Sequence, residues 1–174
     1  LPAAFFMATA HTSFKEKIKF YQQPQIVLKE LNKTLFNEIQ DGMFVTLAYF
    51  LINRETSQIH YSFAGHNRQF LFEAKTKTTK MLKTPGKPIG IMYDIDFNSA
   101  TCSFASGDIL ILFTDGVTEA LINNQEEEGE KLIQEILKTS YDLEPEEITK
   151  LIKSVFLEEG KELFDDFTLL VIKF

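Results

Sequence analysis

The stretch ILILFTDGVTEA, residues 109–120, decides the fold. Its first five positions are apolar, and a glycine lies on either side of the run, Gly107 before it and Gly116 after it. An apolar run of this length between turn residues is typical of a buried strand rather than a helix. The pattern therefore places Asp115 just beyond the C-terminal end of a buried strand.

The rest of the chain predicts helices at both ends and strands in the middle. Apolar residues at helical spacing predict helices from Phe6 to about Tyr21, from Pro24 to Ile39, around residues 132–137, and from about Pro145 to Phe156. Aromatic and β-branched runs predict strands at residues 44–52, 59–64, 68–74, near Met81, 97–104, 109–113 and 167–174. The strand at 44–52 is nearly continuously apolar, so we expect it to be buried on both faces. Consecutive strands paired as an antiparallel meander and covered by helices give an α+β fold.

Composition and charge limit the class of protein. A chain of 174 residues with 44% apolar and 25% charged residues is expected to form a single domain, residues 1–174. The net charge of −7 argues against a nucleic-acid partner, which requires clustered Lys and Arg. Cys102 is the only cysteine and cannot form an internal disulfide, and no apolar run reaches the roughly 20 residues that span a bilayer. We therefore expect a cytoplasmic protein in which this segment makes no membrane contact.

Two acids lie at the ends of predicted strands. Asp115 follows the strand at 109–113, and Asp165 precedes the strand at 167–174. If these strands are antiparallel neighbours, the two carboxylates meet, and paired carboxylates suit hard cations such as Mg²⁺ or Mn²⁺. The alternative is that Asp115 caps the following turn and that Asp165 with Asp166 ends a helix or protects a strand edge.

One rival explanation of the acid after the strand can be excluded. Haloacid-dehalogenase-type phosphotransferases carry DxDGT or DxDGV at this position, and their first aspartate is the nucleophile. Phe113 occupies that position here. No aspartyl-phosphate route through this turn is available, and antiparallel strands do not suit the doubly wound parallel sheet.

Five motifs together resemble those of one phosphatase family. The sequences FVTL, AGHN, PIGI, GDILILFTDGVTEA and DDFTLLV follow the order and spacing of SpoIIE-type metal-dependent protein serine/threonine phosphatases, in the PPM or type 2C superfamily. The resemblance covers Leu1 to Phe174. It implies a β-sandwich of two antiparallel sheets with helices on both outer faces.

The resemblance also implies a metal site and a reaction. In the family, aspartates from several strand ends hold two Mn²⁺ or Mg²⁺ ions, and Asp115 and Asp165 match two of these ligands. Two ions about 3.5–4 Å apart activate a water and neutralise phosphoryl oxygens, so no protein nucleophile is needed. Gly116, Asp166 and Glu119 are candidates to support the ligands, although an exposed glutamate at a helix start explains Glu119 without a metal.

The family's other metal-binding motif has no counterpart in this chain. That motif, an aspartate within GD-x-x-GHG, comes just upstream of the helix that begins LPAA. The sequence is therefore expected to be the C-terminal major part of the domain, to bind metal weakly and to have little activity. Restoring the upstream segment is expected to restore turnover.

Two functions from different classes follow. The first is hydrolysis of phosphoserine or phosphothreonine on a bacterial regulatory protein, such as an anti-sigma-factor antagonist in sigma-factor regulation, under the control of an upstream sensor domain. The second is a non-catalytic regulatory or partner-binding module that keeps the phosphatase fold. Carboxylates retained at both strand ends, Asp115 and the pair Asp165-Asp166, favour the enzyme.

Overall fold

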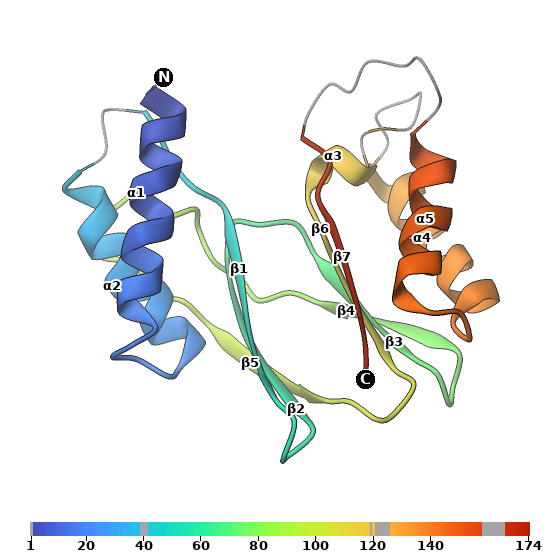
Figure 1. Ribbon diagram of the computed structural model, residues 1–174. Helices are drawn as coiled ribbons and strands as arrows, with labels where there is room; N and C mark the ends of the chain where they lie inside the picture. The colour runs from blue at the N-terminus through green and yellow to red at the C-terminus, as the bar shows by residue number, and fades with distance from the viewer. Residues whose placement is uncertain (1, 39–41, 119, 121–125, 158–165) are drawn as a thin grey trace. The chain divides into compact units, whose positions relative to one another are not determined.

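The chain forms two compact units that are interleaved in sequence. The computed structural model describes residues 2–38, 42–118, 120, 126–157 and 166–174 (Figure 1). The first unit comprises Leu1–His66 and Lys83–Ser103, and the second comprises Asn67–Leu82 and Phe104–Phe174. In the described residues no helix is long and apolar enough to cross a bilayer.

The first unit combines two helices with a three-stranded antiparallel sheet. Its elements are α1 (Pro2–Lys17), α2 (Pro24–Phe36), β1 (Leu47–Asn53), β2 (Gln58–Ala64) and β5 (Ser99–Ser103). The strand order is β1-β2-β5. The core lies between the helices and the sheet, where buried Leu28, Leu31 and Leu35 of α2 join Ala64 and Ile89.

Helix α2 begins at Pro24, as the sequence predicts, but it ends at Phe36 and not at Ile39, which lies outside the described residues. Helix α1 is also shorter than predicted. Pro24 occupies the first turn of α2, where its missing N–H is not needed. Helix α1 ends at Lys17 instead of continuing to Tyr21, because the amides of Lys19 and Phe20 bond three residues back and form a tight turn. Ile18 is therefore not part of the helix and is exposed.

The prediction that the strand at 44–52 is buried on both faces is wrong. Strand β1 begins only at Leu47, lies at the edge of its sheet and is partly buried. The preceding Val45 leaves the β1–β2 ladder and exchanges both backbone hydrogen bonds with Ile89, at 3.0 and 2.8 Å. Apolar continuity here reflects contacts with a loop and with the helices, as between the rings of Phe14 and Tyr49, rather than a central strand.

The second unit is a four-stranded antiparallel sheet with helices packed on it. Its elements are β3 (Gln69–Glu73), β4 (Thr78–Leu82), β6 (Ile109–Phe113), α3 (Asp115–Thr118), α4 (Glu126–Ser140), α5 (Pro145–Phe156) and β7 (Leu169–Lys173). The strand order is β4-β3-β6-β7. Helices α4 and α5 lie beside this sheet (Figure 1). Their apolar residues, including Ile133, Leu137 and Ile152, share a buried core with Phe70 and Ile111 of the sheet.

The predicted continuous meander is also wrong, because β2 and β3 belong to different sheets. The turn after Ala64 does not form a hairpin. Gly65 has a φ of +70°, donates its N–H to the carbonyl of Gly86 at 3.0 Å, and lies so close to Pro88 that a Cβ would meet it at 2.5 Å. This packing leads the chain out of the first sheet, and β5 later returns to pair with β2.

Candidate active site

Strand β6 delivers Asp115 to the surface, as the sequence predicts. Ile109, Leu110 and Ile111 are fully buried, and the short helix α3 starts at Asp115 immediately after the strand and Thr114. Within α3, Asp115 is exposed while the three residues after it are buried. The acid is therefore the group that this strand end presents to solvent.

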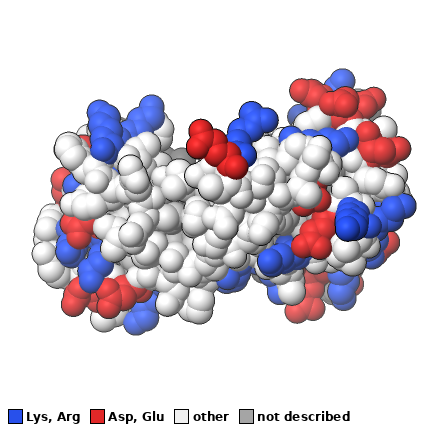
Figure 2. Space-filling model, turned by 90° about the horizontal axis from the view of Figure 1, so that it is seen from below, with Lys and Arg blue, Asp and Glu red and all other residues white. Residues whose placement is uncertain are grey.

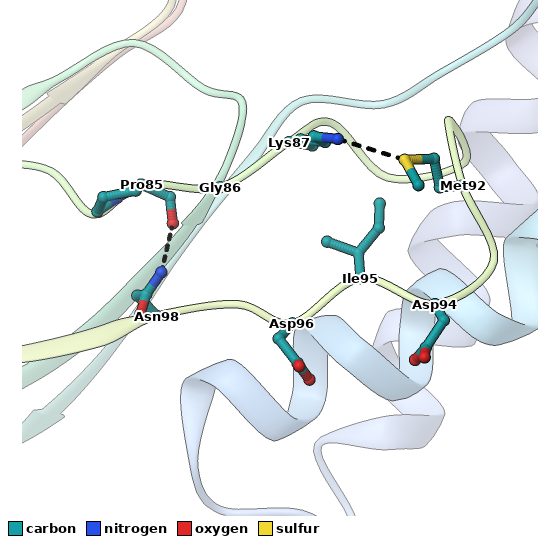
Figure 3. Close-up of a pocket in the computed structure, with 8 residues that line it drawn as sticks. All are labelled: Pro85, Gly86, Lys87, Met92, Asp94, Ile95, Asp96 and Asn98. Carbon is teal, nitrogen blue, oxygen red and sulfur yellow. Dashed lines mark hydrogen bonds between the residues drawn. The ribbon is translucent and has the colours of Figure 1, made fainter.

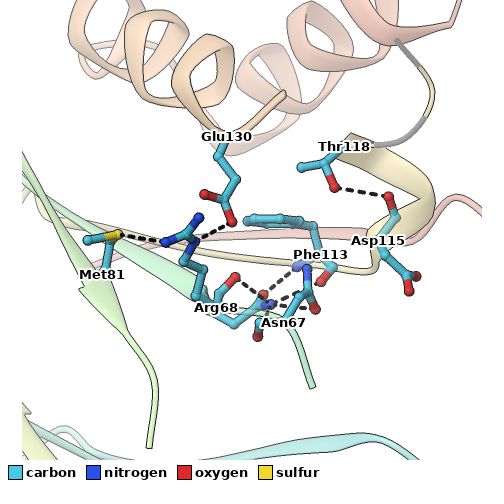
Figure 4. A network of polar contacts seen from close by, with 8 residues as sticks. Asn67, Arg68, Met81, Phe113, Asp115, Thr118 and Glu130 are labelled. Carbon is cyan, nitrogen blue, oxygen red and sulfur yellow. Dashed lines mark hydrogen bonds and ion pairs between the residues drawn. The ribbon is translucent and has the colours of Figure 1, made fainter. Parts of the chain in front are cut away.

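Local hydrogen bonds shape the turn without occupying the whole carboxylate. The Gly116 N–H donates to Oδ1 of Asp115 at 3.1 Å. The Thr118 hydroxyl donates to the Asp115 carbonyl at 3.0 Å (Figure 4). No ion pair joins Asp115 to a described residue within 4.0 Å. Carboxylate oxygen remains available to a ligand.

The approach to β7 lies beside this turn. Strands β6 and β7 are antiparallel neighbours with Phe113 opposite Leu169, which confirms the strand pairing on which the two-acid hypothesis depends. Beyond that pair, the Thr114 N–H donates to the Thr168 carbonyl at 3.1 Å, and the Thr114 hydroxyl donates to the Asp166 carbonyl at 2.9 Å. The segment that follows Asp165 in sequence therefore lies against the residue that precedes Asp115.

The site residues predicted from sequence differ in how far the structure describes them. Asp115, Gly116 and Asp166 are described, and Asp166 is exposed. Asp165 and Glu119 lie outside the described residues. The metal-ligand roles of Asp115 and Asp165, and the supporting roles of Gly116, Asp166 and Glu119, stay predictions.

The donor chemistry at the turn suits a hard divalent cation. Mn²⁺ and Mg²⁺ prefer oxygen ligands, and the exposed Asp115 carboxylate supplies them at the end of a buried strand. Within the described ranges, no group of three or more His, Cys, Asp or Glu side chains is placed to hold a metal ion. The described residues thus fit the ion in ligand type and contribute Asp115 to the proposed site.

Sequence reasoning missed a polar network behind the turn. Arg68 donates from Nε to Oε1 of the buried Glu130 on α4 at 2.6 Å. Next to it, Gln69 is buried and forms hydrogen bonds with the backbone of Phe113. A glutamine inside the apolar run RQFLF was the available signal, since a buried amide requires a partner.

Charged side chains are mixed in sign on the face in Figure 2. Lys and Arg lie among Asp and Glu there rather than gathering in one large patch. Nucleic acids bind continuous basic surfaces, and this face does not offer one. The expectation that the partner is not a nucleic acid stays a prediction.

Comparison with known proteins identifies the class. Residues 1–174 match the family model described as Stage II sporulation protein E (SpoIIE), so the chain belongs to the SpoIIE family. The phosphoserine phosphatase RsbU of Bacillus subtilis is 30% identical over 176 residues, which cover 99% of this chain and 52% of RsbU. The phosphoserine phosphatase RsbP of the same organism is 28% identical over 123 residues, or 68% of this chain and 30% of RsbP. The chain thus spans about half or less of the length of these relatives.

Solved structures with the same fold are PP2C phosphatase domains. The PP2C domain of SpoIIE from Bacillus subtilis, solved with a fragment of its regulatory domain, gives a TM-score of 0.81 at 20% identity and covers 98% of this chain and 50% of that one. The SiaA-PP2C domain of Pseudomonas aeruginosa gives 0.82 at 16% identity, covering 100% and 71%. A SpoIIE phosphatase domain described as Mn presoaked gives 0.66 at 19% identity, covering 92% and 69%. The predicted mixed fold of antiparallel sheets and helices is confirmed as that of PP2C domains.

Proposed function

We propose that this chain is the C-terminal major part of a metal-dependent protein serine/threonine phosphatase domain. The main observation that supports this proposal is the exposed Asp115 carboxylate at the end of β6, beside the segment that leads into β7. Membership of the SpoIIE family and similarity to two phosphoserine phosphatases support this function.

In this proposal Asp115 and Asp165 are the metal ligands of this chain. Two Mn²⁺ or Mg²⁺ ions, when bound, neutralise phosphoryl oxygens and activate water. The Gly116 amide, bonded to Oδ1 of Asp115, orients the carboxylate. The Thr114 hydroxyl, bonded to the Asp166 carbonyl, keeps the two strand ends together. Glu119 is a further supporting residue.

The proposed substrate is a phosphorylated regulatory protein. A phosphatase whose positive charge comes from bound ions does not need a basic surface, which agrees with a net charge of −7. By similarity to RsbU and RsbP, the substrate class is phosphoserine or phosphothreonine on a protein such as an anti-sigma-factor antagonist. Control by an upstream sensor domain is part of the same proposal.

The test is Mn²⁺ titration and phosphopeptide turnover with the full-length protein and Asp115→Asn. The asparagine keeps the size of the side chain but loses the charge, so we expect Mn²⁺ affinity to fall at least tenfold and turnover to be largely lost. Asp142→Ala is the matched control, because Asp142 is an exposed acid of the same unit. Equal Mn²⁺ binding by wild type and Asp115→Asn would exclude Asp115 as a ligand. Binding of the phosphoprotein without turnover by the wild type would instead favour the non-catalytic module.

A further inference from the structure

Gln69 pairs with both backbone polar groups of one residue at the end of β6. Its Oε1 accepts from the Phe113 N–H at 2.6 Å, and its Nε2 lies 3.1 Å from the Phe113 carbonyl oxygen. Gln69 is 1% exposed, so water does not replace these bonds. The backbone pairing of β3 with β6 ends two residues earlier, where Phe70 lies opposite Ile111. The Gln69 side chain therefore forms hydrogen bonds with β6 beyond the point where the backbone pairing between β3 and β6 ends.

A primary amide is suited to this role because it presents a donor and an acceptor side by side, as a peptide group does. An apolar side chain at Gln69 would leave the N–H and the carbonyl of Phe113 without this partner. Each buried polar group that loses its hydrogen bond destabilises a protein substantially. Gln69 thus fixes the position of Phe113 on the side that faces β3.

The amide of Gln69 is itself held in place by its neighbours. Nε2 lies 3.0–3.1 Å from the Asn67 carbonyl and Oδ1 and from the Arg68 carbonyl, in addition to the carbonyl of Phe113. Four oxygens around one NH₂ group favour a donor at this point and oppose a carboxylate. The Arg68–Glu130 ion pair ties the same segment to α4 (Figure 4).

Phe113 lies two residues before Asp115, and the turn between them is held on its other sides as well. Thr114 bonds the approach to β7, as described above. Gly129 of α4 lies so close to Thr118 that a Cβ would meet the Thr118 carbonyl oxygen at 2.7 Å. Gln69 supplies the contact on the β3 side, so the end of β6 and the turn after it are in contact with three different segments.

We infer that Gln69 is a positioning residue of the proposed metal site, which fixes, through Phe113, the turn from which Asp115 presents its carboxylate. The inference rests on the proposed function for its consequence and on the Gln69–Phe113 hydrogen bonds for its geometry. Groups that orient a metal ligand change metal affinity by about 10–100-fold when they are removed. The effect of Gln69 should therefore appear in metal binding and not only in stability.

The test uses the full-length protein with Gln69→Met, Gln69→Glu and the control Ser140→Ala. Ser140 is a buried polar residue of the same unit, and its Oγ donates to the Ile136 carbonyl at 2.6 Å, away from the turn. Two quantities are measured: hydrogen exchange of the Phe113 amide in metal-free protein, and Mn²⁺ affinity by titration calorimetry. Gln69→Met should expose the Phe113 amide and weaken Mn²⁺ binding about tenfold or more. Ser140→Ala should lose stability but keep both values.

Gln69→Glu adds a pH readout that a general loss of packing would not give. A protonated carboxyl has one O–H donor and one acceptor and can replace the amide, whereas a carboxylate cannot donate. Burial raises the pKa of a carboxyl, so Phe113 protection relative to wild type should recover as pH falls. Arg68, Glu130 and Asp115 are the charged residues of the described network, and they are present in both proteins, so each measurement is expressed relative to wild type at the same pH.

Each outcome decides between the inference and the proposed function. Mn²⁺ binding that depends on Asp115 but is within twofold of wild type in Gln69→Met would overturn the inference and leave the proposed function intact. Loss of Phe113 protection without pH recovery in Gln69→Glu would also overturn it. If Asp115→Asn binds Mn²⁺ like wild type, the proposed function fails, and the positioning role fails with it.

Discussion

Among the described residues, each unit contains one fully buried side-chain amide that joins segments far apart in sequence, Asn32 in the first unit and Gln69 in the second, and the two amides support different features. In the first unit, Asn32 of α2 is fully buried and bonds the loop at residues 90–93. Its Nδ2 lies 2.9 Å from the carbonyls of Met92 and Tyr93, and its Oδ1 accepts from the Gly90 N–H at 2.9 Å. In the second unit, Gln69 extends a ladder that already exists.

The difference lies in what each amide supports. The loop at residues 90–93, which Asn32 holds, carries exposed Ile91, Met92 and Tyr93. It borders a pocket of about 440 Å³ (Figure 3). Two of its lining residues are in contact, because Lys87 Nζ donates to Met92 Sδ at 3.3 Å. Asn32 therefore supplies hydrogen bonds to a loop that has no regular secondary structure, whereas Gln69 supplies hydrogen bonds to the last residue of a strand. Loss of the first should affect folding most, and loss of the second should affect the turn at Asp115 most.

The largest effect is expected from breaking the ion pair beside Gln69. Arg68→Met leaves the Glu130 carboxylate, whose side chain is 4% exposed, without its partner. A buried charge that loses its partner is strongly destabilising, so we expect the free energy of unfolding to fall by about 3 kcal/mol in urea titrations.

The matched control for this variant is Lys138→Met, which breaks an exposed pair with Glu135 on the same helix. Exposed pairs contribute little, and the expected loss is about 0.5 kcal/mol or less. A loss in Arg68→Met no greater than in Lys138→Met would show that Glu130 finds another partner and that the network does not depend on Arg68.

A smaller effect is expected from Asn32→Leu, which keeps the size of the side chain but removes both halves of the amide. Three backbone groups of the 90–93 loop lose their bonds, and we expect a loss of about 2 kcal/mol in the free energy of unfolding. Mn²⁺ affinity should stay at the wild-type value, which would separate this amide from Gln69.

Asn37→Ala serves as the control for Asn32, because Asn37 is exposed at the end of the same helix. Its amide bonds only the Lys33 carbonyl among the described contacts, at 3.1 Å. We expect a much smaller change. A drop in Mn²⁺ affinity in Asn32→Leu would remove the distinction between the two amides.

The sequence predicts the local elements well because local patterns determine them. Pro24 and the leucine stripe specify α2, and the capping box of Glu144 and Glu147 starts α5 at Pro145. Strand partners depend on contacts distant in sequence, so the split between β2 and β3 was not predicted. A strand that leaves one sheet has the same local pattern as a strand that turns into a hairpin.

The candidate site was predicted to a similar extent. Asp115 follows a strong apolar run, so its place at a strand end could be predicted. The pairing of β7 with β6 was only a condition of the two-acid hypothesis, and the structure confirms it. Gln69 was missed because its partner, Phe113, is 44 residues away, and a single polar residue does not weaken a strand pattern. Asp165, the proposed partner of Asp115 in the metal site, lies outside the described residues.

The smallest effect is expected from Lys29 and Asp96, an exposed pair of the first unit at 2.6 Å. Their hydrogen bond, followed by their charge attraction, lowers the pKa of Asp96 and raises the pKa of Lys29. Because the pKa of Asp96 is lowered in the folded state, its ionised carboxylate stabilises the fold at pH values above the ordinary pKa of 3.8. This stabilisation is lost as the pH falls through the pKa of the folded state. Because the pKa of Lys29 is raised in the folded state, its ammonium group stabilises the fold at pH values below the ordinary pKa of 10.5. This stabilisation is lost as the pH rises through the pKa of the folded state.

Melting temperatures of wild type and Lys29→Met should therefore differ slightly at neutral pH and converge below about pH 3.8. Because both side chains are screened by solvent, the difference should also shrink in high salt. A difference that persists at low pH would mean that Lys29 acts through packing of its aliphatic stem.

The interleaving of the two units has a consequence for how this protein can be divided. The chain passes from one unit to the other after His66, after Leu82 and again after Ser103. Neither unit is encoded by one continuous stretch, so neither can be duplicated, exchanged or fused to another gene by a single cut at each end. Recombination during evolution would have to move the two units as one piece, and a library of truncations should yield no stable fragment that ends at any of these three crossings.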